Sequence, residues 1–255
     1  MKKLLASLLL VALFPALLPA QEKYLEVTAP GNSLLQLAIA PPVPLSGKEN
    51  AETARELTDV LSFDLGMSGL FRIQPTAPTG GTGGVKPGEF SFEPWKAIGT
   101  DILVKCGYSA DAGRLTLECR LFDVIRGSEL TVKRYSGPMS ERRHMAHLFD
   151  DEALRAITGT AGAFSGKIAF VATTTGNKEI YLMDYDGANV LRLTKNGSIN
   201  LNPDFSPSGR ELVFTSYKKR NPDLYRRDIA SGAEARISSR RGINITAAWA
   251  PDGNR

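Results

Sequence analysis

Residues 165–208 read SGKIAFVATTTGNKEIYLMDYDGANVLRLTKNGSINLNPDFSPS, and residues 209–252 read GRELVFTSYKKRNPDLYRRDIASGAEARISSRRGINITAAWAPD. They are one 44-residue unit written twice, because they align without insertion or deletion and place Phe170 on Phe214 and Tyr181 on Tyr225. A period of about 40–45 residues with several short strands is typical of β-propeller blades, since one blade cannot bury both faces without neighbours. The chain ends at Arg255, where a third unit is beginning.

Each unit is predicted to contribute four strands, because short runs of β-favouring residues alternate with turn signals. The runs are residues 167–173, 179–184, 190–194 and 201–205 in the first unit, and residues 211–216, 223–228, 235–238 and 245–249 in the second. These segments lack the 3.6-residue periodicity of a helical solenoid. We therefore expect residues 164–255 to form a partial β-propeller, with repeats at 165–208 and 209–252.

Residues 21–163 have a different pattern and are predicted to form a separate α/β domain. Strands are expected at residues 34–40 and 129–135, helices at residues 50–68 and 140–157, and a short helical segment around Trp95. Helices interspersed with strands and an antiparallel hairpin indicate a mixed sheet covered by two helices.

The two cysteines lie in the arms of that hairpin, residues 101–110 and 114–124. If Ala112 and Gly113 form the turn, Cys106 stands directly opposite Cys119 on an apolar face. This register allows a cross-strand disulfide, and two buried thiols are an equally good interpretation because free cysteine packs like a small hydrophobic residue.

The start of the chain predicts export. Lys2 and Lys3 precede an apolar run over residues 4–18, and a plausible cleavage site follows Ala20. The alternative is an uncleaved anchor, although about 15 residues is short for a membrane span. Residues 1–20 are therefore predicted to be a cleaved signal peptide, with a secreted, soluble mature chain.

Charge and motifs argue against several function classes. Loss of residues 1–20 lowers the net charge from +4 to +2, and no interleaving of basic and aromatic residues marks a nucleic-acid groove. His144 and His147, with Asp150 and Asp151 close behind, form only a weak metal-site pattern. The turn after Asp184 keeps too few carboxylates in the second repeat for a calcium loop. Without a nucleophile elbow or a phosphate-binding loop, we expect no enzyme activity, cofactor or metal.

The order of these parts resembles the TolB family of the Tol-Pal system. The resemblance extends over nearly the whole chain: it includes the Trp95 segment followed by Gly99-Thr100-Asp101, the helix with Arg143 and His147, and the propeller motif Pro203 to Gly209. It implies a propeller that has six blades in full-length relatives, so that this chain is expected to be C-terminally truncated. A first blade of three strands follows, because the family closes its ring with a C-terminal strand.

The resemblance also implies a non-enzymatic adaptor located in the periplasm, which reaches membranes only through its partners. Such proteins link inner-membrane TolA, TolQ and TolR to outer-membrane Pal, with other outer-membrane lipoproteins as further partners, and support envelope integrity and outer-membrane constriction at cell division. Two sets of partner-binding residues follow from it. The TolA candidates are Glu22, Lys23, Tyr24, Leu25, Glu26, Val27 and Thr28, and the Pal candidates are Asn200, Asn202, Asn244 and Thr246.

Each set has a structural alternative. Residues 22–28 suit an extended peptide that adds to a partner's sheet, and equally an edge strand of the first domain. The aligned Asn200 and Asn244 are typical of residues that hold a tight turn. A rival function is the propeller of a secreted peptidase whose hydrolase domain lies beyond residue 255, and a sugar-binding or scaffold propeller is a third.

Overall fold

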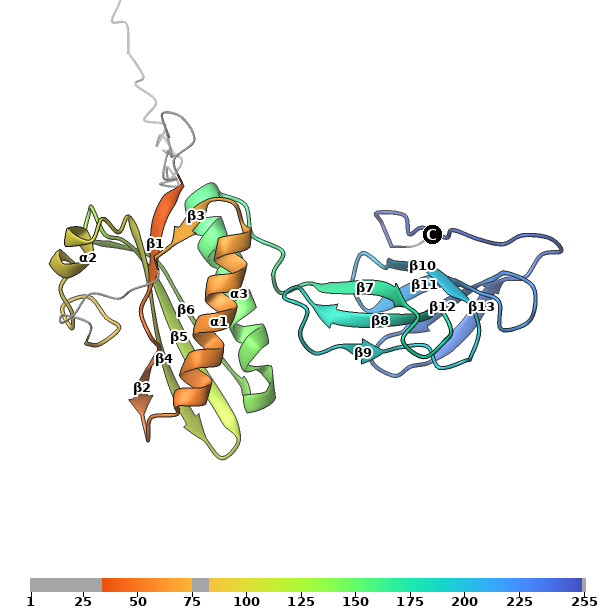
Figure 1. The fold of residues 1–255 in the computed structure, drawn as a ribbon, viewed down its shortest axis with the longest axis horizontal. Helices are drawn as coiled ribbons and strands as arrows, with labels where there is room; N and C mark the ends of the chain where they lie inside the picture. The colour runs from red at the N-terminus through yellow and green to blue at the C-terminus, as the bar shows by residue number, and fades with distance from the viewer. Residues whose placement is uncertain (1–33, 75–82, 254–255) are drawn as a thin grey trace, which may run out of the picture.

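The computed structural model describes residues 34–74 and 83–253. They form a helix-covered sheet followed by two smaller β-sheets, joined by residues 159–166 (Figure 1). Residues 22–28 and the predicted signal peptide lie outside the described residues. None of the described helices is both long and apolar enough to cross a bilayer.

The first part is the predicted mixed sheet. Its strand order is β3-β1-β4-β5-β6, with bounds Phe71–Ile73, Leu35–Ile39, Ile102–Asp111, Arg114–Asp123 and Ser128–Pro138. β1 runs parallel to β3 and β4, whereas β4, β5 and β6 are antiparallel. β2 (Val43–Ser46) also pairs with β4, beyond the end of β1, and the sequence prediction missed both β2 and β3.

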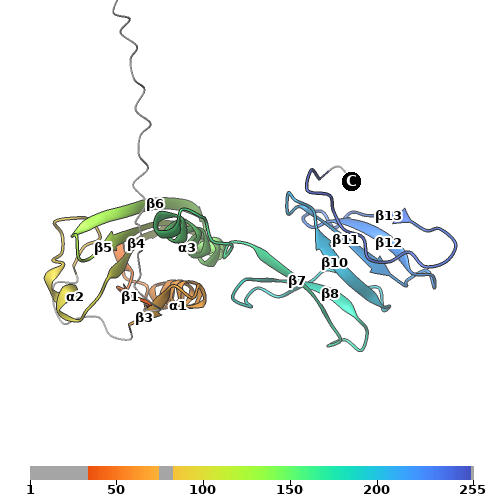
Figure 2. The same ribbon diagram turned by 90° about the horizontal axis from the view of Figure 1, so that it is seen from above.

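Two long helices cover one face of this sheet (Figure 2). α1 (Ala51–Met67) begins where the Asn50 side chain accepts a hydrogen bond from the Thr53 backbone, and α3 (Arg142–Thr158) ends at Gly159, whose φ is 80°. Their apolar faces and the sheet make the main core, which includes Leu57, Leu61, Leu65, Val104, Leu117, Leu121, Phe149 and Ala153. The two helices therefore lie where the sequence places them.

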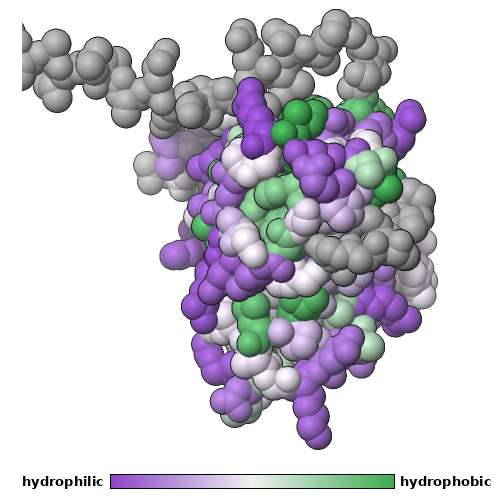
Figure 3. Space-filling view, turned by 90° about the vertical axis from the view of Figure 1, so that its left-hand side faces the viewer, coloured by the Kyte–Doolittle hydropathy of each residue, from purple (hydrophilic) through white to green (hydrophobic). Residues whose placement is uncertain are grey.

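The opposite face of the sheet carries a smaller cluster. The five-residue helix α2 (Glu93–Ala97) brings the fully buried Trp95 against Leu103 and Phe122. Lys105 lies in the same layer with its ammonium 4.5 Å from the centre of the Phe90 ring, and burial lowers its pKa to about 8. On the side of this part that faces away from the propeller sheets, polar side chains surround small apolar groups (Figure 3).

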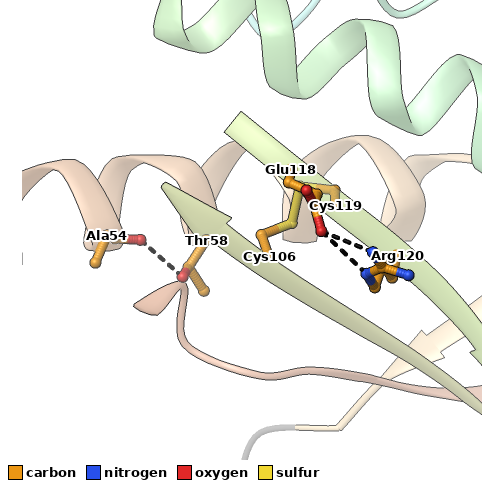
Figure 4. The surroundings of a disulfide bond; sticks show 6 residues. All are labelled: Ala54, Thr58, Cys106, Glu118, Cys119 and Arg120. Carbon is orange, nitrogen blue, oxygen red and sulfur yellow. Dashed lines mark hydrogen bonds and ion pairs between the residues drawn. A yellow bond between two sulfur atoms is a disulfide. The ribbon is translucent and has the colours of Figure 1, made fainter. Parts of the chain in front are cut away.

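A disulfide joins β4 to β5 inside the main core. Ala112 and Gly113 both have positive φ, at 45° and 78°, and form the turn that pairs Cys106 directly with Cys119. The bridge closes a loop with a sequence separation of 13 and lies beneath α1, beside Ala54 and Thr58 (Figure 4).

The propeller part consists of two antiparallel sheets that are offset from the sequence repeats. The first sheet is β7-β8-β9 (Lys167–Ala172, Glu179–Asp184, Leu191–Arg192), and the second is β10-β11-β12-β13 (Asn200–Phe205, Glu211–Ser216, Asp223–Asp228, Glu234–Ser238). The last strand of repeat one thus becomes the first strand of the second sheet. A stacked aromatic pair recurs in both, Phe170 with Tyr181 and Phe214 with Tyr225.

The first blade has three strands, as expected, and one predicted strand is wrong. Residues 245–249 form no strand, because the sheet to which they would belong has no second strand among the described residues. They are held instead through two side chains: the Thr246 backbone donates to Thr215 Oγ1 and the Trp249 backbone to Asp204 Oδ2. Large apolar side chains of the blades remain exposed, among them Val190, Leu191, Ile199, Ile237, Ile243 and Ile245.

Reduction of the Cys106–Cys119 bridge is expected to lower the free energy of unfolding by about 3 kcal/mol, because the unfolded chain regains the entropy of a loop of roughly 14 residues. Urea unfolding with and without a reducing agent measures the difference. A Cys106→Ala/Cys119→Ala variant serves as control, since its stability should not respond to the reductant. Two reactive thiols in the denatured, unreduced protein would contradict the bridge.

Candidate functional site

The Pal candidates of the first repeat lie at the start of β10, where Asn200 is fully buried. Its side-chain amide donates to Glu179 Oε2 at 3.0 Å and to the backbone oxygen of Lys178, also at 3.0 Å. Glu179, also fully buried, accepts from Thr194 Oγ1 and from the backbone of Gly197. Asn200 therefore satisfies a buried carboxylate and the turn before its own strand.

The second repeat keeps the equivalent residues 44 positions later but bonds them differently. Asp223 replaces Glu179 and lies 3.3 Å from Arg236, the counterpart of Arg192. The amide of the buried Asn244 donates to the Arg240 backbone oxygen at 2.7 Å and accepts from Ser238 Oγ at 2.8 Å. Because both asparagines have their polar atoms engaged inside the blade, their position in the repeat has a structural cause.

Asn202 and Thr246 differ from the two asparagines in that their side chains are exposed. They occupy equivalent places in the repeat and share an unusual backbone, with φ at 53° and 59°. In the first copy this conformation coincides with a register shift between β10 and β11. Of the four Pal candidates, only these two present a free surface to a partner.

A buried polar cluster lies where the first part meets the turn after β8. His147 on α3 places Nδ1 2.5 Å from Asp64 Oδ2 of α1 and Nε2 3.6 Å from Asp186 Oδ2. The Arg143 guanidinium contacts Asp186 and also Glu56, at 3.3 Å. His147 and Asp64 are essentially inaccessible to solvent.

Aromatic rings surround this cluster and a carboxylate holds the connecting segment. The Tyr185 ring meets the edges of Phe63 and Phe164 at centroid distances of 6.5 and 5.1 Å. Asp151 Oδ1 accepts the Phe164 backbone N–H at 2.6 Å, and its Oδ2 accepts that of Ser165 at 3.1 Å. Asp151 thus orders the connecting segment instead of forming the metal pattern considered with His144 and His147.

Sequence reasoning missed the group that the fold brings together. His147, Asp184 and Asp186 each offer a ligand atom, and these atoms lie within 4.8 Å of one another. The histidine and the carboxylates are 37 and 39 residues apart, so no local spacing reveals them. The recurrence of Asp184 as Asp228 only indicated a turn, and Gly187, with φ at 82°, forms one here.

Two profile matches and several curated relatives agree on the family. The TolB amino-terminal domain matches residues 23–130, and the TolB beta propeller domain matches residues 154–255. The Tol-Pal system protein TolB of Geobacter sulfurreducens is 51% identical over 210 residues, which is 82% of this chain and 48% of that protein. The chain belongs to the TolB family.

Other TolB proteins extend the likeness along the chain. The TolB of Desulfosudis oleivorans is 34% identical over 254 residues, covering 98% of this chain and 58% of its own length. The crystal structure of TolB from Acinetobacter baumannii shares the fold, with a TM-score of 0.74 at 23% identity over 87% of this chain and 54% of that one. The chain thus spans about half the length of these TolB proteins, and the family is a non-enzymatic component of the Tol-Pal system.

The raised pKa of Asp150 should make the stability of this TolB chain depend on pH. Burial, and then the nearby Asp64 carboxylate, raise its pKa well above the ordinary 3.8. At a pH between 3.8 and the folded-state pKa, Asp150 holds a proton in the folded chain that it has released in the unfolded chain. The contribution to stability is therefore complete below pH 3.8 and is lost as pH rises through the folded pKa.

Asp150→Asn should remove this loss. The difference in free energy of unfolding between the variant and the wild type should therefore shift in favour of the variant as the pH rises from acid to neutral. Urea unfolding across that range measures the gain. Asp59→Asn, at an exposed position of α1, is the matched control and should show none. Parallel curves for Asp150→Asn and the wild type would contradict the raised pKa.

Proposed function

We propose that this chain is part of a periplasmic adaptor that links TolA, TolQ and TolR of the inner membrane to Pal at the outer membrane. In that role it supports envelope integrity and outer-membrane constriction during cell division. The observation that carries the proposal is the match of both TolB domains, in order, together with 51% identity to a named Tol-Pal system protein. The signal sequence predicted at residues 1–20 agrees with a periplasmic location.

We assign TolA binding to residues 22–28. Tyr24, Leu25 and Val27 favour an extended conformation, and an extended peptide binds a partner's sheet edge through its main-chain hydrogen bonds. The segment precedes β1 in the sequence.

Deletion of residues 21–28 should abolish binding to the TolA of the same organism while the thermal unfolding transition is kept. Val27→Pro should weaken binding more than Val27→Ala, because proline removes a backbone donor as well as the side chain. Isothermal titration calorimetry measures both. Unchanged affinity after the deletion would refute this assignment.

We assign Pal binding to the blade surface that carries Asn202 and Thr246. Both side chains are exposed at the same place in the two sequence repeats, and a partner seated across this surface meets each of them. Asn200 and Asn244 support this surface from below through the turns that they hold.

Asn202→Gly/Thr246→Gly should weaken Pal binding without loss of stability, because glycine accepts the positive φ of both positions and removes only the side chains. Asn200→Ala should instead destabilise the chain by about 1–3 kcal/mol, since it removes one of the donors to the buried Glu179 carboxylate and the bond to the Lys178 backbone oxygen. Pal affinity and urea unfolding separate the two effects. Full Pal affinity in the double glycine variant would exclude these residues from the interface.

A further inference from the structure

The buried cluster at the junction contains a histidine nitrogen without a hydrogen-bond partner. His147 is 1% exposed, and its Nε2 neither donates nor accepts a hydrogen bond among the described residues. The nitrogen faces Asp186 Oδ2 at 3.6 Å, and an oxygen of Asp184 completes a group within 4.8 Å. Buried polar atoms normally have partners, so this one requires an explanation.

The other nitrogen of the same ring is firmly held. His147 Nδ1 lies 2.5 Å from Asp64 Oδ2, and Asp64 contacts no lysine or arginine among the described residues. A carboxylate on Nδ1 places the proton there and leaves the lone pair on Nε2 directed toward the two aspartates. Metal-binding histidines are oriented in the same way by a carboxylate behind the ring.

We propose that His147 Nε2, Asp184 and Asp186 bind a zinc ion, with water in the fourth position. One imidazole and two carboxylates form a donor set that Zn²⁺ accepts, whereas Mg²⁺ and Ca²⁺ prefer oxygen alone. Ligand bonds of about 2.0–2.1 Å place tetrahedral ligand atoms about 3.4 Å apart. The 3.6 Å between His147 and Asp186 is close to that edge, and side-chain rotation of Asp184 closes the remainder.

Two cations now neutralise these carboxylates, and both can be replaced. Lys167 contacts Asp184, but its side chain is 46% exposed and can turn into solvent. Arg143 contacts Asp186 and also Glu56, so that it keeps a partner when a metal binds the aspartate. A dication would thus replace the Lys167 ammonium at Asp184, and Arg143 would keep its contact with Glu56.

The site joins two parts of the molecule and goes beyond the adaptor role proposed above. His147 belongs to α3, which packs on the mixed sheet, while Asp184 ends β8 and Asp186 lies in the following turn of the first blade. Zinc bound to all three fixes the blade against the helix. The stabilisation adds to the contacts of Tyr185 with Phe63 and Phe164.

The test uses the untagged chain, stripped with a chelator and titrated with Zn²⁺ in a calorimeter. One zinc per chain is expected, and Co²⁺ in its place should give the visible absorption of a tetrahedral complex. His147→Gln and Asp184→Asn should each weaken zinc binding by more than tenfold, and Asp64→Asn by about 10–100-fold, because it loosens the orientation of the ring. Asp228→Asn, the counterpart of Asp184 in the second repeat, should bind as the wild type does.

A loss of zinc binding could also result from misfolding, so a variant that is expected to gain zinc affinity serves as a further test. Lys167→Met removes the competing ammonium and should tighten zinc binding a few-fold, because the metal no longer has to displace Lys167 from Asp184. Absence of stoichiometric zinc in the folded wild type would overturn the proposal. Equal binding by His147→Gln, or no gain in Lys167→Met, would also overturn it. TolA and Pal affinities measured in chelator test the adaptor role separately.

Discussion

A propeller blade cannot cover its own faces, and this constraint shapes the second half of the molecule. The sheets are staggered against the repeats, so β10 of repeat one pairs with β11 of repeat two and the repeats are joined by a shared ladder. The staggering brings the segment before β10 against β8, where the buried Glu179 requires donors. Asn200 provides one, and Asn244 has the same place in the next copy. These two asparagines therefore have a structural role in the repeat, whereas the side chains two residues further on are exposed to a partner.

The junction, where α1 and α3 contact the turn after β8, is stabilised differently because it buries charged groups. An ionised group removed from water must be paired or neutralised, and at this junction Arg143 and Lys167 compensate Asp186 and Asp184 while His147 faces Asp64. Asp150 lies near Asp64 and Asp151, and its burial together with these carboxylates raises its pKa. The Tyr185 ring packs against Phe63 and Phe164 next to these charged groups.

Local patterns predicted most of the fold, whereas contacts between distant segments escaped them. The helix after Asn50, the Cys106–Cys119 register and three strands of each repeat follow from capping, turn and alternation signals carried within a few residues. β3 is only three residues long, and β2 contains Pro44, so neither shows a strand pattern. Residues 245–249 have such a pattern but form no ladder, because a strand exists only when another pairs with it. The approach of His147 to Asp186 depends on how α3 packs against the first blade, and no spacing along the chain encodes it.

Any coupling between the mixed sheet and the blades would pass through the junction and the segment that Asp151 holds, since these connect the two parts in the described structure. Coupling requires that a junction have two arrangements of different affinity for each partner. A cluster with an unpaired imidazole nitrogen and exchangeable cations meets that requirement better than an apolar contact does, because its ion pairs can be remade one at a time while the aromatic packing persists. The charged groups, and not the rings of Tyr185 and Phe164, are thus the part of the junction able to distinguish one bound state from another.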